Sequence, residues 1–207
     1  MQFVNTKSNK VSLVFILLLC AVIIGGANSC LASENQLTVS PHQAYQAYEY
    51  ALEYVNNEVA YLYGGRISVE QYLTELAKGR EPGVDIGVDA SALIVNSYRN
   101  VISDIRFWFD DAKTTTVSDA TSKILAEYNS YPLTQSEIVP GDLIFFKNTA
   151  GNITGAAIFS HIQGDVIHFI TASANAGRVV LTNARLKGKY WANSFAGFGR
   201  LTCPINR

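Results

Sequence analysis

Apolar and polar positions along this chain follow a helical period in the first half and a strand period in the second. Apolar residues recur at three- and four-residue spacing in the first half, which is typical of amphipathic helices. Ser40 and Pro41 supply a cap and a first helical position, a capping box begins at Ser68, and Asp89 can cap a third helix. The predicted helices are 41–57, 69–78, 90–101 and 118–128.

From Pro140 onward, β-branched and aromatic residues gather in short runs that are typical of strands. The predicted strands are 143–147, 155–163, 166–172, 178–183 and 197–201. Gly164-Asp165 is a two-residue turn signal between the second and third of these runs. Helices followed by an antiparallel meander predict an α+β fold.

Composition favours one globular domain behind a leader. The chain has 207 residues, of which 48% are hydrophobic and 16% charged, and this is enough apolar material for a core. The formal net charge is -1 without a dense basic run, so we expect no nucleic-acid partner.

The N-terminus is typical of an export signal. Lys7 and Lys10 precede an apolar run, 11–24, which is short for a membrane span and is followed by small residues. We therefore predict a signal peptide at 1–32, a linker at 33–40 and a domain at 41–207, without a transmembrane span after leader removal. The protein would be exported, to a bacterial periplasm or cell envelope or into the medium.

Cys30 leaves two interpretations of the leader open. Cleavage after Ser29 or Ala32 satisfies a small-residue rule, and the second cut leaves Cys203 as the only cysteine, without an internal disulfide. Alternatively, Cys30 is the lipid anchor of a lipoprotein, although Ala27 stands where such signals usually carry leucine.

Four short motifs occur in a characteristic order. They are Tyr61-Leu62-Tyr63-Gly64-Gly65, Asp89-Ala90-Ser91-Ala92-Leu93, Pro140-Gly141-Asp142-Leu143-Ile144-Phe145-Phe146 and Tyr190-Trp191 with Phe195-x-Gly197-x-Gly199-Arg200. Over about residues 45–202 they resemble the NlpC-type cell-wall cysteine peptidases. The resemblance implies a papain-like fold, with N-terminal helices packed on a small antiparallel sheet, and cleavage of peptidoglycan stem peptides between D-glutamate and diaminopimelate or lysine. An insertion at about 66–88 departs from the family.

A papain-like hydrolase needs a thiol at a helix N-terminus, a histidine base and a third polar group that orients this base. By the resemblance, the nucleophile position falls on Ala90, the base position on Gly155 and the third position on His168. A methyl group cannot attack a carbonyl, and loss of the nucleophile from such a triad costs on the order of 10⁶ in rate. Because two of the three groups are absent, we predict a naturally degenerate member of the family.

The expected function is binding without catalysis. We expect the protein to hold a peptidoglycan peptide, or an envelope protein as partner, in a groove with Ala90 at its floor. The predicted groove residues are Tyr61, Tyr63, Asp89, Ser91, His161 and His168.

An active hydrolase or acyltransferase with relocated catalytic groups, such as His161 in place of the base, is the alternative. Ser91 is disfavoured as its nucleophile, because one step along a helix turns the side chain by about 100°. His161 and His168 would lie opposite one another across the turn. No third ligand stands at a fixed spacing from them, so we predict no metal site and no cofactor.

Overall fold

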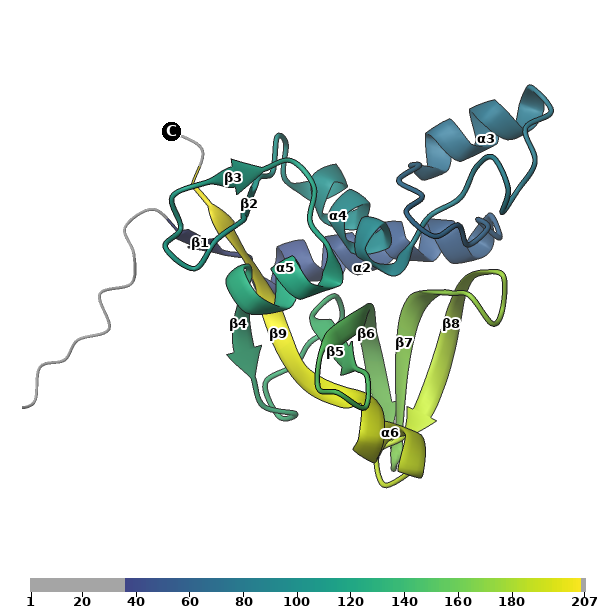
Figure 1. The fold of residues 1–207 in the computed structure, drawn as a ribbon. Helices are drawn as coiled ribbons and strands as arrows, with labels where there is room; N and C mark the ends of the chain where they lie inside the picture. The colour runs from purple at the N-terminus through teal and green to yellow at the C-terminus, as the bar shows by residue number, and fades with distance from the viewer. Residues whose placement is uncertain (1–35, 206–207) are drawn as a thin grey trace, which may run out of the picture. The chain divides into compact units, whose positions relative to one another are not determined.

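The computed structural model describes residues 36–205, and Figure 1 shows their fold. Helices pack on an antiparallel sheet, which confirms the predicted α+β class. The predicted leader at 1–32, with Cys30, lies outside the described residues. Within them, no helix combines the length and the apolar character needed to cross a membrane.

The helices begin where the local sequence caps them. Ser40 and Ser68 each form a reciprocal capping box with the glutamine three residues later, and the Asp89 side chain accepts from the Ala92 backbone N–H. The helices are α2 (Pro41–Asn56), α3 (Val69–Ala77), α4 (Ala90–Val101), α5 (Ser122–Tyr128) and α6 (Lys189–Ser194). The prediction of a helix from residue 118 was wrong, because Thr121 is the cap of α5 and residues 118–120 form an irregular link from the hairpin strand that ends at Val117.

The main sheet is antiparallel, with the order β1-β9-β5-β6-β7-β8, and β4 also pairs with β9. Its strands are β1 (Gln36–Thr38), β4 (Ser130–Leu133), β5 (Leu143–Lys147), β6 (Ile153–Gln163), β7 (Val166–Ser173), β8 (Arg178–Arg185) and β9 (Phe195–Pro204). The separate hairpin consists of β2 (Phe107–Trp108) and β3 (Thr116–Val117). The predicted linker at 33–40 thus contains a strand, since β1 gains backbone hydrogen bonds from β9 at the far end of the domain sequence.

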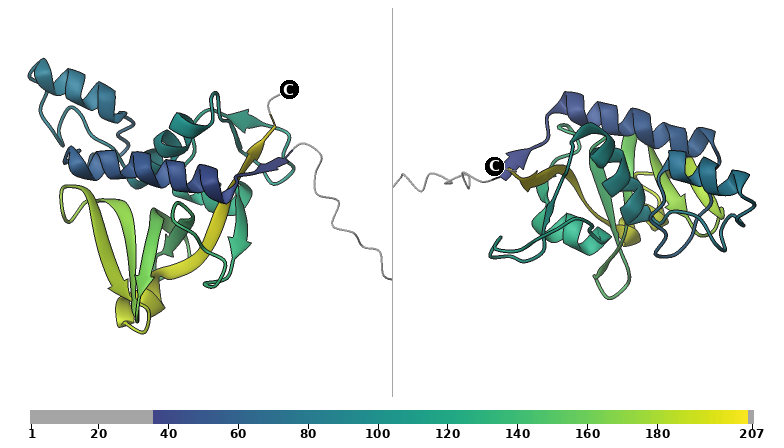
Figure 2. Two further views of the ribbon diagram at one scale, coloured as in Figure 1. Left: turned by 180° about the vertical axis from the view of Figure 1, so that it is seen from behind. Right: turned by 90° about the horizontal axis from the view of Figure 1, so that it is seen from above.

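Each face of the sheet contributes to a hydrophobic cluster, and Figure 2 shows α2 and α6 at opposite ends of the strands. On one face, α2 and α4 bury a core that includes Tyr54, Leu93 and Ile158. On the other face, Trp191 of α6 packs in a second cluster with Phe146 and Phe198. Side chains alternate between faces along a strand, so β5 contributes to both clusters and is buried along nearly its whole length.

A buried ion pair connects the third and fourth of the sequence motifs. Asp142, with 0% of its surface exposed, accepts hydrogen bonds from Nε and an Nη of Arg200, both at 2.9 Å, and from the Val139 N–H at 2.7 Å. The Tyr98 hydroxyl donates to the carbonyl of Gly141 at 2.8 Å, and burial raises the pKa of this hydroxyl. These contacts join α4, the start of β5 and β9.

Candidate functional site

A groove of about 890 Å³ lies where the start of α4 meets the sheet. Its walls come from residues 61–66, the starts of α4 and α5, the β5–β6 hairpin, the second half of β7, and α6. Segments far apart in the sequence therefore form one concave surface, as expected for a ligand site.

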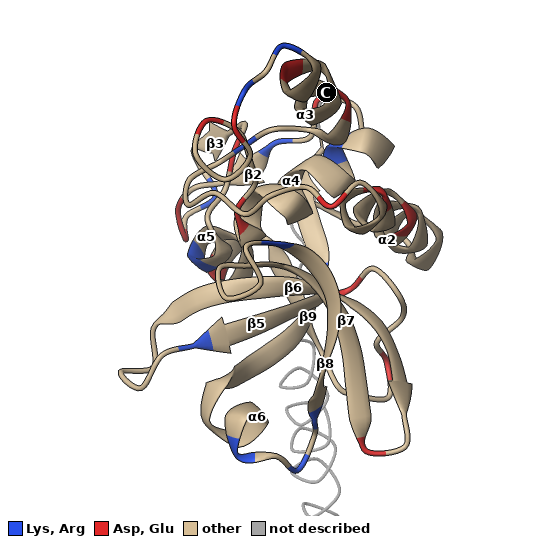
Figure 3. Ribbon diagram, turned by 90° about the vertical axis from the view of Figure 1, so that its right-hand side faces the viewer, with Lys and Arg blue, Asp and Glu red and all other residues tan. Residues whose placement is uncertain are grey.

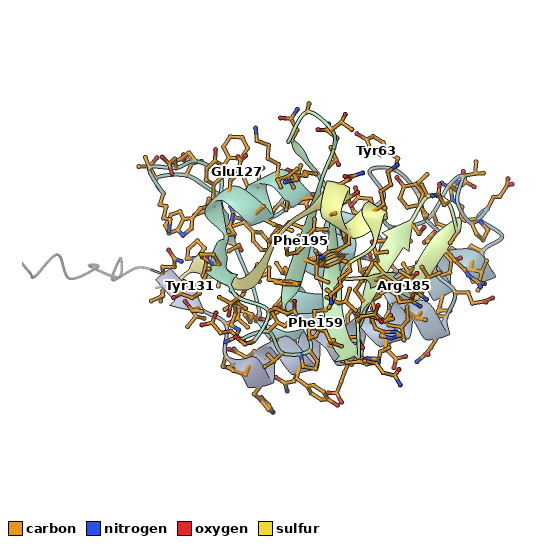
Figure 4. All side chains as sticks on the ribbon, turned by 90° about the horizontal axis from the view of Figure 1, so that it is seen from below. Tyr63, Glu127, Tyr131, Phe159, Arg185 and Phe195 are labelled. Carbon is orange, nitrogen blue, oxygen red and sulfur yellow. The ribbon has the colours of Figure 1, made fainter. Side chains whose placement is uncertain are left out.

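Several residues predicted for the site line this groove. Tyr61, Tyr63, Asp89 and Ser91 are among its walls. Tyr63 projects from its loop with 88% of its surface exposed (Figure 4).

The two positions that the resemblance assigned to the nucleophile and the base line the same groove. Ala90 is the first residue of α4, and Gly155 lies on β6 opposite Phe146 of β5. A Cβ atom built on Gly155 would lie 3.7 Å from Cβ of Phe146, which is an ordinary contact. The position is therefore open to a side chain, although none is present.

His161 and His168, which were also predicted for the groove, are not among the residues that line it. They face each other near the β6–β7 turn, with ring centroids 4.2 Å apart, and neither belongs to the groove walls. The two-residue turn fixes this register, and both strands continue well beyond the histidines. The polar residues that β7 contributes to the groove lining are Thr171 and Ser173. The groove lining in the described chain thus contains neither cysteine nor histidine.

Arg66, which opens the inserted segment, is a groove residue that the sequence did not reveal. One of its Nη atoms donates to Oδ1 of Asp89 at 2.9 Å and to Oγ of Ser91 at 2.8 Å. Its Nε lies 2.9 Å from Oδ2 of Asp119. The insertion therefore places a guanidinium beside the start of α4, and no local sequence pattern indicates a contact across so many residues.

Ser91 belongs to this network. Its hydroxyl donates to Oδ1 of Asp89 at 2.8 Å while it accepts from Arg66, and the side chain is buried. The Ser91 hydroxyl thus both donates and accepts, and the groove walls described in the structure offer no imidazole that could activate it as a nucleophile. Its hydrogen bonds stabilise the helix start.

The groove carries more basic than acidic side chains. Arg66, Lys123 and Lys147 line it, whereas Asp89 is its one acidic wall residue within the described chain. Figure 3 shows the basic positions on α5 and at the end of β5. Lys123 lies 3.9 Å from Glu127, and Lys147 has no ion-pair partner among residues 36–205. This charge distribution favours a ligand with carboxylate groups.

Aromatic rings close the groove near α6. Phe146 has its ring centroid 5.5 Å from that of Phe169 and 6.2 Å from that of Tyr190, and all three residues line the groove. Tyr190 is exposed, so an apolar group of a ligand can pack on its ring.

Comparison with known proteins identifies the family. The model of the NlpC/P60 family matches residues 58–200, and the chain belongs to this family. Membership supports a function related to the cell wall.

Two solved structures of another protein match part of this chain. They are the crystal structure of Ly7917 with the hydrolyzing product of MDP, at 12% identity, and the crystal structure of Ly7917, at 13% identity. The TM-score is 0.40 for both, and the matches cover 80% and 78% of this chain but 63% and 62% of Ly7917. The chain thus spans less than two thirds of that protein. The comparison with curated proteins gave no match.

Proposed function

We propose that this protein is exported to the bacterial cell envelope and there binds stem peptides of peptidoglycan without cleaving them. The observation that carries this proposal is the groove of an NlpC/P60 domain whose walls, among residues 36–205, contain no thiol and no imidazole. Ala90 and Gly155, to which the family resemblance assigns the positions of the nucleophile and the base, both line this groove. A ligand held there would not be turned over.

The groove suits an acidic peptide. Lys123 and Lys147 can pair with ligand carboxylates, and the rings near α6 offer surface to small apolar side chains. Each exposed ion pair is worth about 0.2–1 kcal/mol, so we expect modest affinity that decreases as the salt concentration rises.

The test is calorimetric titration of the protein with a diaminopimelate-type muropeptide, followed by mass spectrometry of the same sample. We expect binding and no new fragments. Lys147→Glu should weaken binding about tenfold, because it replaces an attraction by a repulsion. Lys187→Glu is the matched control, since Lys187 is exposed and lies outside the groove walls.

Two outcomes would contradict the proposal. New fragments would mean an active enzyme with unrecognised catalytic groups. Absence of binding, together with co-purification of an envelope protein, would instead favour a protein partner. The alternative function, an active hydrolase or acyltransferase with relocated catalytic groups, gains no support from His161, because this residue is not among the groove walls.

A further inference from the structure

His161 and His168 form a pair on the surface of the β6–β7 hairpin, away from the groove walls. Their rings are stacked, with centroids 4.2 Å apart and planes inclined by 6°. His161 is exposed and His168 is half-buried. Two imidazoles are thus held side by side, and at least one is open to solvent.

A buried hydroxyl relay orients the exposed ring. Oγ of Ser160 lies 2.9 Å from Nδ1 of His161 and 3.1 Å from the hydroxyl oxygen of Tyr48 on α2. Ser160 is 3% exposed. When Nδ1–H donates to Ser160 and Ser160 donates to Tyr48, both contacts are satisfied and Nε2 of His161 keeps a free lone pair. Histidines that bind metals usually have their other ring nitrogen fixed in this way.

We propose that His161 and His168 bind a divalent transition-metal ion such as Cu²⁺ or Ni²⁺ at this surface. Neutral imidazole suits these ions, and affinity rises toward copper along the series. The His168 ring must turn out of the parallel stack to direct a nitrogen toward the same ion, because the lone pairs lie in the ring planes, whereas the His161 ring keeps its contact with Ser160.

The protein would supply only part of the coordination shell of the metal ion. No group of three or more His, Cys, Asp or Glu residues in the described part of the chain is placed to hold a metal, so the protein supplies two imidazoles and water the remaining ligands. The sequence did not reveal the contacts from Tyr48 through Ser160 to His161. Because they orient the His161 ring, we replace the expectation that the two histidines bind no metal.

The proposal is tested with Cu²⁺ alone and protein free of any histidine tag. We expect one ion per chain by calorimetry, and electron paramagnetic resonance should show coupling to two imidazole nitrogens. His161→Ala and His168→Ala should each weaken binding at least tenfold, whereas His42→Ala, at an exposed position of α2, should leave it unchanged.

The variant Ser160→Ala tests whether Ser160 orients the His161 ring without binding the metal ion itself. It should weaken binding about tenfold while coupling to two nitrogens remains. The proposal is overturned if the protein binds no Cu²⁺, if binding survives His161→Ala or His168→Ala, or if only one imidazole nitrogen couples. Far-ultraviolet circular dichroism of each variant shows whether a loss reflects unfolding.

Discussion

Replacing Arg200 with methionine removes the cation from a carboxylate that has no access to solvent. Asp142 would lose two of its three hydrogen-bond donors and keep only the Val139 N–H. The Asp142 hydrogen bonds also raise the pKa of the Arg200 guanidinium, and only 16% of the Arg200 side chain is exposed. Loss of one partner from such a pair costs about 3–5 kcal/mol, because a buried charge is left without compensation.

Urea denaturation followed by circular dichroism measures this cost as a lower free energy of unfolding. In a domain of this size, each kcal/mol lowers the melting temperature by about 2–4 °C, so we expect a decrease on the order of 10 °C. Arg200→Lys keeps the charge but not the two-pronged geometry and should lie between the wild type and Arg200→Met.

The double variant Asp142→Leu with Arg200→Met gives the decisive comparison. It removes the unpaired buried charge and should therefore be more stable than Arg200→Met alone. A loss below about 1 kcal/mol for Arg200→Met, or a double variant less stable than the single one, would refute the role of the pair.

Three further predictions follow from local geometry. Gly141→Ala should lower the free energy of unfolding, measured by urea denaturation, by about 3 kcal/mol. The reason is that φ of Gly141 is +101° and the new Cβ would lie 1.8 Å from the carbonyl oxygen of Ala44. A decrease below about 1 kcal/mol would contradict this prediction. Burial raises the pKa of the Cys203 thiol to about 11, above its unfolded value of about 8.5, so Cys203 should label slowly with thiol reagents at pH 8 until urea is added. The same shift means that the contribution of Cys203 to stability is full below about pH 8.5 and is lost as the pH rises toward 11, whereas Cys203→Ala should lack this dependence. Asp89→Ala removes the α4 cap and a partner of Arg66, so it should cost about 1–2 kcal/mol and speed hydrogen exchange at the start of α4; unchanged exchange there would show that the cap is dispensable.

Features set by neighbouring residues could be predicted from the sequence. The helix at 90–101 was predicted with the bounds of α4, because Asp89 caps it and the apolar stripe that follows is local. The β6–β7 turn was predicted for the same reason, since Gly164-Asp165 determines the register that places His161 opposite His168.

Features set by distant partners could not be predicted. β1 is three residues long and depends on β9, and β4 contains Pro132 and, within residues 36–205, pairs with β9 alone. The groove lies at the ends of β6 and β7 that are far from their turn, so its lining from β7 comes from residues within 169–173 and not from His168. The turn signal in the sequence does not show how far the two strands extend. Arg66 lies in the groove because the chain brings it back beside Asp89 at the start of α4, and no local sequence pattern indicates this contact.

The positions that the family resemblance assigns to the nucleophile and the base, Ala90 and Gly155, yield a prediction that separates thiol reactivity from catalysis. Ala90→Cys places a thiol at the first position of a 12-residue helix, where the helix dipole lowers the thiol pKa. We expect this variant to react with iodoacetamide near neutral pH but to leave diaminopimelate-type muropeptides uncut, because no imidazole of the described residues lines the groove to transfer protons.

Ala90→Cys combined with Gly155→His should add slow cleavage, which mass spectrometry would detect. Gly155 can accept the first side-chain atom with only ordinary contacts to Phe146, and Gly155→His alone is the control that carries a base without a nucleophile. Robust cleavage by Ala90→Cys alone would show that the groove already contains a base, and the assignment of this position to Gly155 would then be wrong. A double variant without activity, but with a reactive thiol, would mean that residue 155 cannot direct an imidazole to residue 90. In that case the groove has lost its catalytic geometry as well as its catalytic side chains.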